Sequence, residues 1–420
     1  MGATTAAPGG SMTVEGSCAD EFAEVRAEFE RNFAERGEVG AGVHVTVDGE
    51  TVVDLWGGDA GGRPWTEDTI THVWSCTKGA TALCAHVLAS RGELDLDAPV
   101  TRYWPEFGQN GKADALVRHL LAHQAGLTAW REPVPPGGMF DWGLMTDLLA
   151  RQEPFWAPGT RHGYHALTFG HLVGEVVRRV SGASLAEFFE KEVSGPLGLD
   201  FWLTLPEDLE PLVAPTIPAD RGGTLPKLYV AGMTRPESMQ ALLLTNSGGY
   251  VAASNTREAH AAQFGAVGGM SNARGLAQMY RPLALGGEYN GVRLVADTQI
   301  PVMSSVVSAG HDEMLLAPTR FSLGFMKAVD NHYLPPEERG ALMSEDAFGH
   351  SGMGGSLGFA APESRMSFGY AMTRMGQGVG VNERGQSLVD AVYRALGYRQ
   401  APGGLWFRTG SERASPHRAE

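Results

Sequence analysis

Strand-type alternation of apolar and polar residues occurs near both ends of this chain, and it constrains the fold more than any other feature. Residues 42–58 read as a β-hairpin, because two alternating runs flank the turn Asp48-Gly49. Residues 355–361 and 365–374 read as a second pair of strands. Strands so far apart in sequence predict one antiparallel sheet that draws on both ends of the chain.

Helical periodicity fills the remaining regions. An amphipathic helix is predicted over residues 20–36 and a closing helix over 386–396, one on each side of the strands. The middle of the chain is rich in helices and loops, and further helices are expected at 116–127, 167–180 and 271–281, the last stopped by Pro282. The order predicts an α+β fold: an antiparallel sheet flanked by the terminal helices, with an inserted helical domain.

These elements give a division into domains. Residues 17–75 and 300–400 are assigned to the sheet domain, and residues 76–299 to the mainly helical domain. Residues 1–16 are read as a disordered leader or a cloning remnant, and 401–420 as a C-terminal tail.

Composition narrows the functional classes. The net charge of −15 argues against a nucleic-acid partner. No segment reaches the roughly 18 consecutive apolar residues of a membrane span, and the first eleven residues lack the features of a signal peptide. The three cysteines, Cys18, Cys76 and Cys84, fit neither a zinc site nor a disulfide framework. Reduced thiols in a cytoplasmic protein are the simplest account.

The tetrapeptide Ser75-Cys76-Thr77-Lys78 offers a nucleophile and a base three residues apart, at the start of an apolar helix predicted over 75–91. Positions i and i+3 share one helix face, so the Ser75 hydroxyl and the Lys78 amine can meet. A lysine can take the serine proton if burial and nearby positive charge lower its pKa. The alternative is an N-cap serine followed by a surface lysine.

Two further segments carry chemically suggestive residues. Tyr164 follows a Pro158-Gly159 turn and precedes a helix, so its hydroxyl could shuttle a proton with a lowered pKa, or its ring could simply pack under the loop. His350 lies in a segment with five glycines between positions 349 and 358. Such density suits a backbone that approaches a ligand and points an N–H group at an oxyanion. A flexible glycine loop is the other interpretation.

Together the three segments resemble the three motifs of the serine β-lactamase and penicillin-binding-protein superfamily: Ser-x-x-Lys, Tyr-x-Asn and Lys-Thr-Gly. Their order agrees, and segments 94–100, 119–127, 268–277 and 349–363 resemble the family's connecting regions. The resemblance covers about residues 20 to 398 and implies the β-lactamase/transpeptidase-like fold.

Two positions depart from the superfamily pattern. Ala166 stands where the family has the asparagine of Tyr-x-Asn, and His350 stands where it has the lysine of Lys-Thr-Gly. Those residues hold the amide and the carboxylate of β-lactam substrates, so their absence argues against a dedicated β-lactamase. A histidine is common in the esterase branch. The chain therefore looks most like the family VIII carboxylesterases, which resemble class C β-lactamases.

The resemblance implies a serine hydrolase that cleaves carboxylic esters of short to medium acyl chain through an acyl-enzyme on Ser75. Lys78 and Tyr164 would relay the proton, and the backbone N–H groups of Ser75 and Met353 would form the oxyanion hole. The expected substrate-binding residues are His350, Ser351, Gly352, His165 and Trp156. The expected partner is a small-molecule ester, without nucleic acid, membrane, metal or organic cofactor.

Three alternatives stay open at this point. The same acyl-enzyme would serve an acyltransferase, or weak β-lactamase or D-amino peptidase activity.

An α/β-hydrolase nucleophile at Ser351 is disfavoured, because Gly349-His350-Ser351-Gly352-Met353 lacks the final glycine and precedes a strand. His119 and His123 lie four residues apart, but Leu120 replaces the glutamate of a zinc protease motif, so packing is expected instead. A homo-oligomer is possible.

Overall fold

The computed structural model describes residues 13–220, 222–331 and 333–408. Its main element is a six-stranded antiparallel sheet with the order β1-β3-β2-β13-β12-β11. The strands are β1 (Val14–Cys18), β2 (Gly40–Val47), β3 (Glu50–Gly58), β11 (Phe348–Ser351), β12 (Leu357–Ala361) and β13 (Met366–Met372). Strand β13 pairs with β2, with Phe368 opposite Val45, so strands from the two ends of the chain meet in the middle of the sheet.

The β2–β3 hairpin forms where the sequence predicts it. Asp48 and Gly49 both have positive φ, at 52° and 86°. This is the backbone geometry that a two-residue hairpin turn requires, and Asp-Gly supplies it at low cost. The alternating pattern then buries Val43, Val45 and Leu55, which lie in the core of the sheet domain.

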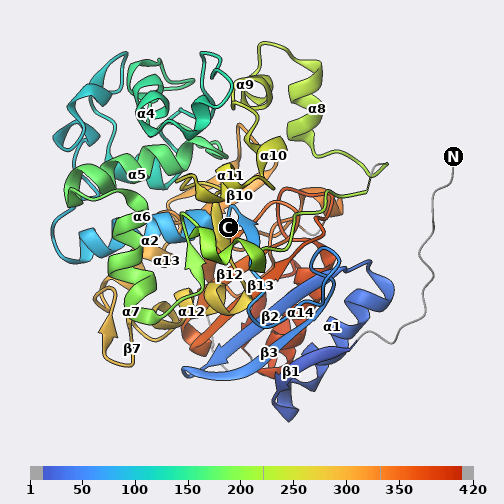
Figure 1. Ribbon diagram of the computed structural model, residues 1–420. Helices are drawn as coiled ribbons and strands as arrows, with labels where there is room; N and C mark the ends of the chain where they lie inside the picture. The colour runs from blue at the N-terminus through green and yellow to red at the C-terminus, as the bar shows by residue number, and fades with distance from the viewer. Residues whose placement is uncertain (1–12, 221, 332, 409–420) are drawn as a thin grey trace, which may run out of the picture.

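Helices cover both faces of the sheet (Figure 1). The terminal helices α1 (Ala23–Glu35) and α14 (Glu383–Ala395) pack together on one face, where their apolar residues share one core with Phe359 and Phe368. Helix α12 (Ala273–Ala284) lies on the other face. It approaches closely because Gly369 leaves no side chain in its way: an added Cβ would lie 2.1 Å from the Ala273 carbonyl oxygen.

The inserted region forms a helical lobe around a second core. Its helices are α2 (Thr77–Ser90), α3 (Val117–Leu121), α4 (Trp142–Arg151), α5 (Thr168–Ser181), α6 (Leu185–Phe189), α7 (Gly195–Leu197), α8 (Lys227–Thr234), α9 (Met239–Thr245), α10 (Tyr250–Ala253), α11 (Arg257–Ala261) and α13 (Gln299–Ser304). Short antiparallel pieces join the lobes: β4 (Thr71–Trp74), β5 (Phe201–Trp202) and β6 (Gly269–Ser271) form one, and β9 (Ser308–His311) with β10 (Pro318–Phe321) forms another. Two hairpins, β7 (Glu288–Tyr289) with β8 (Val292–Arg293) and β14 (Tyr398–Gln400) with β15 (Trp406–Arg408), complete the set.

The α+β fold with flanking terminal helices and an inserted helical lobe is confirmed, but several predicted boundaries are wrong. Strand β1 adds residues 14–16, which the sequence placed in a leader, because Val14–Cys18 pairs with the exposed edge of β3. Residues 406–408, placed in the tail, form β15, and the indole of Trp406 is buried against Tyr393. Pro282 does not stop α12, which includes Pro282 in its last turn and ends at Ala284. The rest of the predicted leader, up to residue 12, and the tail from 409 lie outside the described residues.

Candidate active site

Ser75 lies in the turn between β4 and α2, which begins at Thr77 rather than at Ser75. The residue before it, Trp74, has φ of 51°, an uncommon value for a non-glycine residue that turns the chain sharply. Thr77 secures the turn, since its hydroxyl donates to the Trp74 carbonyl and accepts the Gly269 N–H at 2.8 Å. The side chain of Ser75 therefore projects into the seam between the two lobes from a fixed backbone.

Lys78 is fully buried, and its amine meets three oxygen atoms. Nζ lies 3.1 Å from Ser75 Oγ and donates to the carbonyl oxygens of Ala166 at 2.7 Å and Ala266 at 2.9 Å. Burial holds the pKa of Lys78 well below its ordinary value. In the neutral form that burial favours, the amine keeps two N–H groups for the two carbonyls and turns its lone pair to the Ser75 hydroxyl. Burial, which the sequence prediction named, is the cause of the lowered pKa, and the nearby positive charge that it also named is not.

Tyr164 lies next to the Ser75–Lys78 pair. Lys78 Nζ lies 4.8 Å from the centre of the Tyr164 ring. The ring stacks on Phe321 and contacts His123, with centroids 6.0 Å and 5.0 Å apart. Burial raises the pKa of Tyr164 above its ordinary value, and the nearby Ser75 hydroxyl offsets the rise only in part. The lowered pKa expected from the sequence is therefore wrong, and the phenol is protonated at neutral pH.

Asp312 holds the Tyr164 backbone in place, and no motif of the sequence indicated this role. Its buried carboxylate accepts the Tyr164 N–H at 3.0 Å and the N–H groups of Met314 and Leu315 at 2.9 and 2.8 Å. The hydroxyl of Thr319 donates to it as well, at 3.2 Å. Four donors on one buried carboxylate fix the loop that carries the phenol.

His350 lies on the edge strand β11, opposite Gly358 of β12. Its Nδ1 donates to the Ser351 carbonyl at 2.7 Å, whereas Nε2 is buried without a partner among the described residues. Burial lowers the pKa of His350 to about 3, so the ring is neutral at ordinary pH. Its carbonyl accepts from the Cys76 thiol at 3.2 Å, which ties β11 to the Ser75 turn.

Gly352 brings the end of β11 against that turn. An added Cβ would lie 2.4 Å from the Val73 carbonyl oxygen, so only glycine fits this close approach. Met353 follows in the next turn. In the described part of the chain, neither its N–H nor that of Ser75 donates a hydrogen bond. Two unused N–H donors next to a nucleophile are what an oxyanion hole provides.

His165 and Trp156, also expected to bind substrate, lie behind the site. Both ring nitrogens of His165 are used inside the protein: Nδ1 donates to the Gly163 carbonyl at 2.8 Å, and Nε2 accepts the Leu127 N–H at 3.2 Å. The Trp156 ring packs against Gly163, where an added Cβ would meet it at 2.7 Å. Both residues support the Tyr164 loop. His123 also packs there, accepting the His165 N–H, as the sequence predicted for it.

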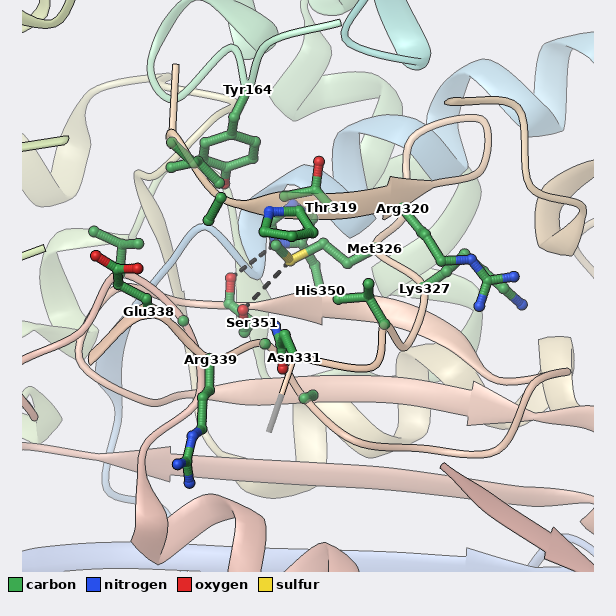
Figure 2. Close-up of a pocket in the computed structure, with 18 of the residues that line it drawn as sticks. Tyr164, Thr319, Arg320, Met326, Lys327, Asn331, Glu338, Arg339, His350 and Ser351 are labelled. Atoms are coloured by element: carbon green, nitrogen blue, oxygen red, sulfur yellow. Dashed lines mark hydrogen bonds between the residues drawn. The ribbon is translucent and has the colours of Figure 1, made fainter. Parts of the chain in front are cut away.

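A cavity opens beside Tyr164, His350 and Ser351, with about 830 Å³ of empty space counted to its open mouth. Figure 2 shows the rings of Tyr164 and His350 near each other at its inner end, with Ser351 below them. Arg320 and Lys327 extend to one side of the cavity, and Glu338 and Arg339 lie on the other. Among the described residues, no three side chains of the metal-ligand type gather at one point.

The sequence missed the parts of the site that carry no distinctive side chain. The two carbonyls that hold Lys78 belong to alanines, and Asp312 is a single aspartate outside any motif. No spacing pattern could have indicated them. The glycine density around position 352 was the available signal for the close approach of β11. The prediction that the backbone approaches a ligand there rested on this signal.

Comparisons with known proteins identify the family of this chain. The profile of the family described as Beta-lactamase matches residues 25–393. The esterase/β-lactamase LipL of Mycobacterium tuberculosis is 33% identical over 381 residues, covering 88% of this chain and 85% of LipL. Esterase EstB of Burkholderia gladioli is 34% identical over 197 residues, covering 42% of this chain and 50% of EstB.

Solved structures show the same relationship. A family VIII carboxylesterase superposes with a TM-score of 0.79 at 38% identity, covering 91% of this chain and all of that one. EstA of Arthrobacter nitroguajacolicus Rue61a superposes with a TM-score of 0.79 at 32% identity, covering 90% of this chain and 98% of EstA. These matches confirm the resemblance that the three motifs indicated. The chain belongs to the β-lactamase family, in the branch that includes the family VIII carboxylesterases.

Proposed function

We propose that this protein is a serine carboxylesterase that hydrolyses small-molecule esters through an acyl-enzyme on Ser75. The observation that carries the proposal is the position of the Lys78 amine, 3.1 Å from Ser75 Oγ and held by two carbonyls. A serine hydroxyl becomes a strong nucleophile when an adjacent base removes its proton. A neutral, buried lysine whose lone pair faces that hydroxyl is such a base.

In the first step, Ser75 Oγ attacks the ester carbonyl carbon while its proton passes to Lys78 Nζ. The tetrahedral intermediate places its negative oxygen between the N–H groups of Ser75 and Met353. Its collapse breaks the bond to the alcohol, which must take up a proton to leave. Tyr164 supplies that proton from its phenol and recovers one from Lys78, so no charge remains on either residue after acylation.

Water completes the cycle by the reverse route. It attacks the acyl carbonyl as Tyr164 and Lys78 take its proton, and collapse releases the acid and restores the Ser75 hydroxyl. The raised pKa of Tyr164 and the lowered pKa of Lys78 both favour neutral resting forms. The resting site therefore holds a base and an acid at the same pH, which is what this exchange requires.

The surroundings favour a simple ester of short to medium acyl chain over a β-lactam. Ala166 offers no side-chain group to a substrate amide, and His350 is neutral, so it has no charge for a substrate carboxylate. Binding of substrate by His350 and Ser351 is supported by their place on the cavity wall. Gly352, the third residue of this group, follows directly after Ser351. We assign His165 and Trp156 to the support of Tyr164 instead.

Transfer of the acyl group to an alcohol or amine is the second candidate, because it differs only in the acceptor that resolves the acyl-enzyme. The open mouth of the cavity beside Tyr164 would admit such an acceptor. Addition of a primary alcohol during turnover of a p-nitrophenyl ester distinguishes the two. Formation of the new ester, measured by chromatography against the free acid, gives the partition between transfer and hydrolysis.

The chemistry is tested by Ser75→Ala and covalent labelling. Ser75→Ala should abolish release of p-nitrophenol from a short-chain ester without changing the melting temperature. Mass spectrometry after treatment with a serine-reactive phosphonate should place the adduct on Ser75 in the unmodified enzyme. Ser351→Ala is the matched control and should still be labelled. An adduct on Ser351, or full activity in Ser75→Ala, would contradict the proposal.

We also propose that the enzyme acts in a reducing compartment such as the cytoplasm. The three cysteines are unpaired in the structure, and two of them, Cys76 and Cys84, are buried beside or within α2. The described residues contain no helix long and apolar enough to cross a membrane. Cell fractionation with an antibody to the chain tests the compartment.

The oligomeric state is a separate question. Light scattering of the pure protein measures whether it forms a homo-oligomer.

A further inference from the structure

The exposed apolar side chains of this protein are concentrated in one short segment. Nine large hydrophobic residues are exposed in the described part of the chain, and five of them lie between positions 225 and 251. They are Leu225, Val230, Met233, Leu244 and Val251, which we call the α8–α10 strip. Met233 is 60% exposed and Val251 is 51% exposed. A monomeric soluble surface rarely gathers apolar residues in this way without a binding role.

Three residues of the strip, Val230, Met233 and Leu244, lie on the helix pair α8–α9. Helices α8 and α9 stand side by side at the edge of the helical lobe in Figure 1. Gly232 permits the contact, since an added Cβ would lie 2.5 Å from Leu244 Cδ1. Val230 and Met233 are three positions apart on α8 and so share one face of the helix. That face is turned to solvent, not to the core.

The charge of the strip differs from that of the whole chain. The protein carries 48 acidic and 33 basic residues, a net charge of −15. Residues 224–256 contain Lys227, Arg235 and Glu237 as their charged residues, a net charge of +1. An anionic lipid surface would repel most of this protein more strongly than this segment.

The strip is continuous with the catalytic seam. Pro226 and Leu228 line the cavity that Tyr164 and His350 border. On the other side of α8, Tyr229 and Val251 line a second cavity together with Trp74 and Met353. The Tyr229 hydroxyl donates to the Met353 sulfur at 3.4 Å. One strip residue, Val251, therefore shares a cavity with Met353 of the proposed oxyanion hole and with Trp74, which precedes Ser75.

We infer that the α8–α10 strip is a docking surface for assembled lipid esters, such as a micelle or a bilayer, and delivers substrate molecules from that surface to Ser75. The occupant follows from the three observations above: an apolar face, a segment without the acidic excess of the whole chain, and a cavity that the strip shares with residues beside the site. The delivery of substrate rests on the proposed esterase function, whereas the docking does not. The two can therefore be tested separately.

Docking is tested with the Ser75→Ala protein, which cannot alter the lipid. Flotation with phosphatidylcholine vesicles containing a minor fraction of phosphatidylglycerol should recover the protein with the vesicles. Val230→Glu combined with Met233→Glu should lower the bound fraction at least tenfold, because two carboxylates replace the apolar face. Val302→Glu, at an exposed valine on α13 away from the strip, is the matched control and should bind as before.

Delivery is tested with the active enzyme. The double variant should keep its kcat/KM on dissolved p-nitrophenyl acetate and lose at least tenfold on emulsified tributyrin. The docking proposal is overturned if the Ser75→Ala protein stays with the soluble fraction, if the double variant still floats, or if light scattering shows a dimer that the double variant dissociates. If the wild-type enzyme hydrolyses no ester but still floats with the vesicles, the esterase function is rejected and the docking proposal stands.

Discussion

Single residues decide the protonation states of this site. Burial acts in opposite directions on its two titratable groups, lowering the pKa of Lys78 and raising that of Tyr164, because it disfavours the charged form of each. The Ala166 and Ala266 carbonyls fix the amine without supplying a negative charge that would protonate it. A base and an acid thus coexist 4.8 Å apart, measured from the amine to the ring centre.

Coupling between these two residues can be measured directly. Lys78→Ala and Tyr164→Phe should each lower kcat by about 100-fold or more, and the double variant should be little worse than either single variant, since the two act as one unit. Steady-state kinetics on p-nitrophenyl butyrate would check this. Ser351→Ala provides a reference change near the site. Losses that multiply in the double variant would show that no proton relay joins the two groups.

Asp312 should act on the rate through Tyr164 without touching the substrate. In Asp312→Asn, the side-chain NH₂ takes the place of one carboxylate oxygen and faces N–H donors that it cannot accept. The Tyr164 loop should therefore loosen, and kcat should fall about 10- to 100-fold with little change in KM. Asp141→Asn is the control, since asparagine caps α4 equally well. If the melting temperature falls while kcat is unchanged, the role of Asp312 is only structural.

The neutral state of His350 predicts the substrate preference and its pH dependence. The kcat/KM for p-nitrophenyl butyrate should exceed that for nitrocefin by orders of magnitude, because no charge faces the lactam carboxylate. The ratio of the two values should stay constant from pH 8 to pH 5.5, since the pKa of His350 is about 3 and the shared base Lys78 cancels in the ratio. If the ratio of the ester kcat/KM to the lactam kcat/KM falls as the pH is lowered, His350 becomes charged in this range.

At the scale of elements, the contact between β11 and the turn before α2 assembles the site. Gly352→Ala should lower kcat/KM at least tenfold, because its Cβ would lie 2.4 Å from the Val73 carbonyl and push the two segments apart. Gly143→Ala is a matched control in α4, where the nearest atom would be 3.4 Å away. Kinetics together with melting curves separate displacement of the site from loss of fold. Equal kcat/KM in the two variants would show that the close contact is not needed.

The same scale explains what the sequence could and could not reveal. The β2–β3 hairpin was predictable, because local turn chemistry and alternation both specify it. The Ser75–Lys78 pairing was predictable from spacing and the motif resemblance. Strand β11 was not identified as a strand, because its four residues include a glycine and a histidine and its pairing depends on β12. Strand β1 and the carbonyls of Ala166 and Ala266 depend entirely on tertiary contacts, which a single sequence does not display.

At the scale of the whole molecule, the site lies where two separately packed cores meet. The sheet core and the helical core each bury their own apolar residues, and the segments that cross between them carry the chemistry: the Ser75 turn, the Tyr164 loop and β11. This arrangement explains why so many ionisable groups near the seam are buried. Five histidines, His72, His86, His165, His171 and His350, are buried with pKa values of about 3 to 4.

Those histidines make the fold sensitive to acid. In the unfolded chain a histidine binds a proton below about pH 6.5, whereas in the folded protein these rings stay neutral down to about pH 4. The unfolded state therefore gains protons first, and the free energy of unfolding should fall as pH falls from 6.5 to 4, by roughly 1 kcal/mol per pH unit for each histidine. The raised pKa values of Glu38 and Asp312 act in the opposite sense and offset part of this loss.

The contribution of one ring can be isolated at His171, which lies among Trp130, Trp142 and Phe264 with neither nitrogen hydrogen-bonded in the described structure. His171→Phe removes one titrating group and two unsatisfied nitrogens while keeping an aromatic ring. Urea unfolding at a series of pH values should show a shallower loss of stability in this variant, by about one proton per molecule between pH 6 and pH 4.5. His311 is exposed on the surface, and His311→Phe is the control that should leave the slope unchanged. Parallel slopes in the wild type and His171→Phe would show that the buried rings are not the source of the acid sensitivity.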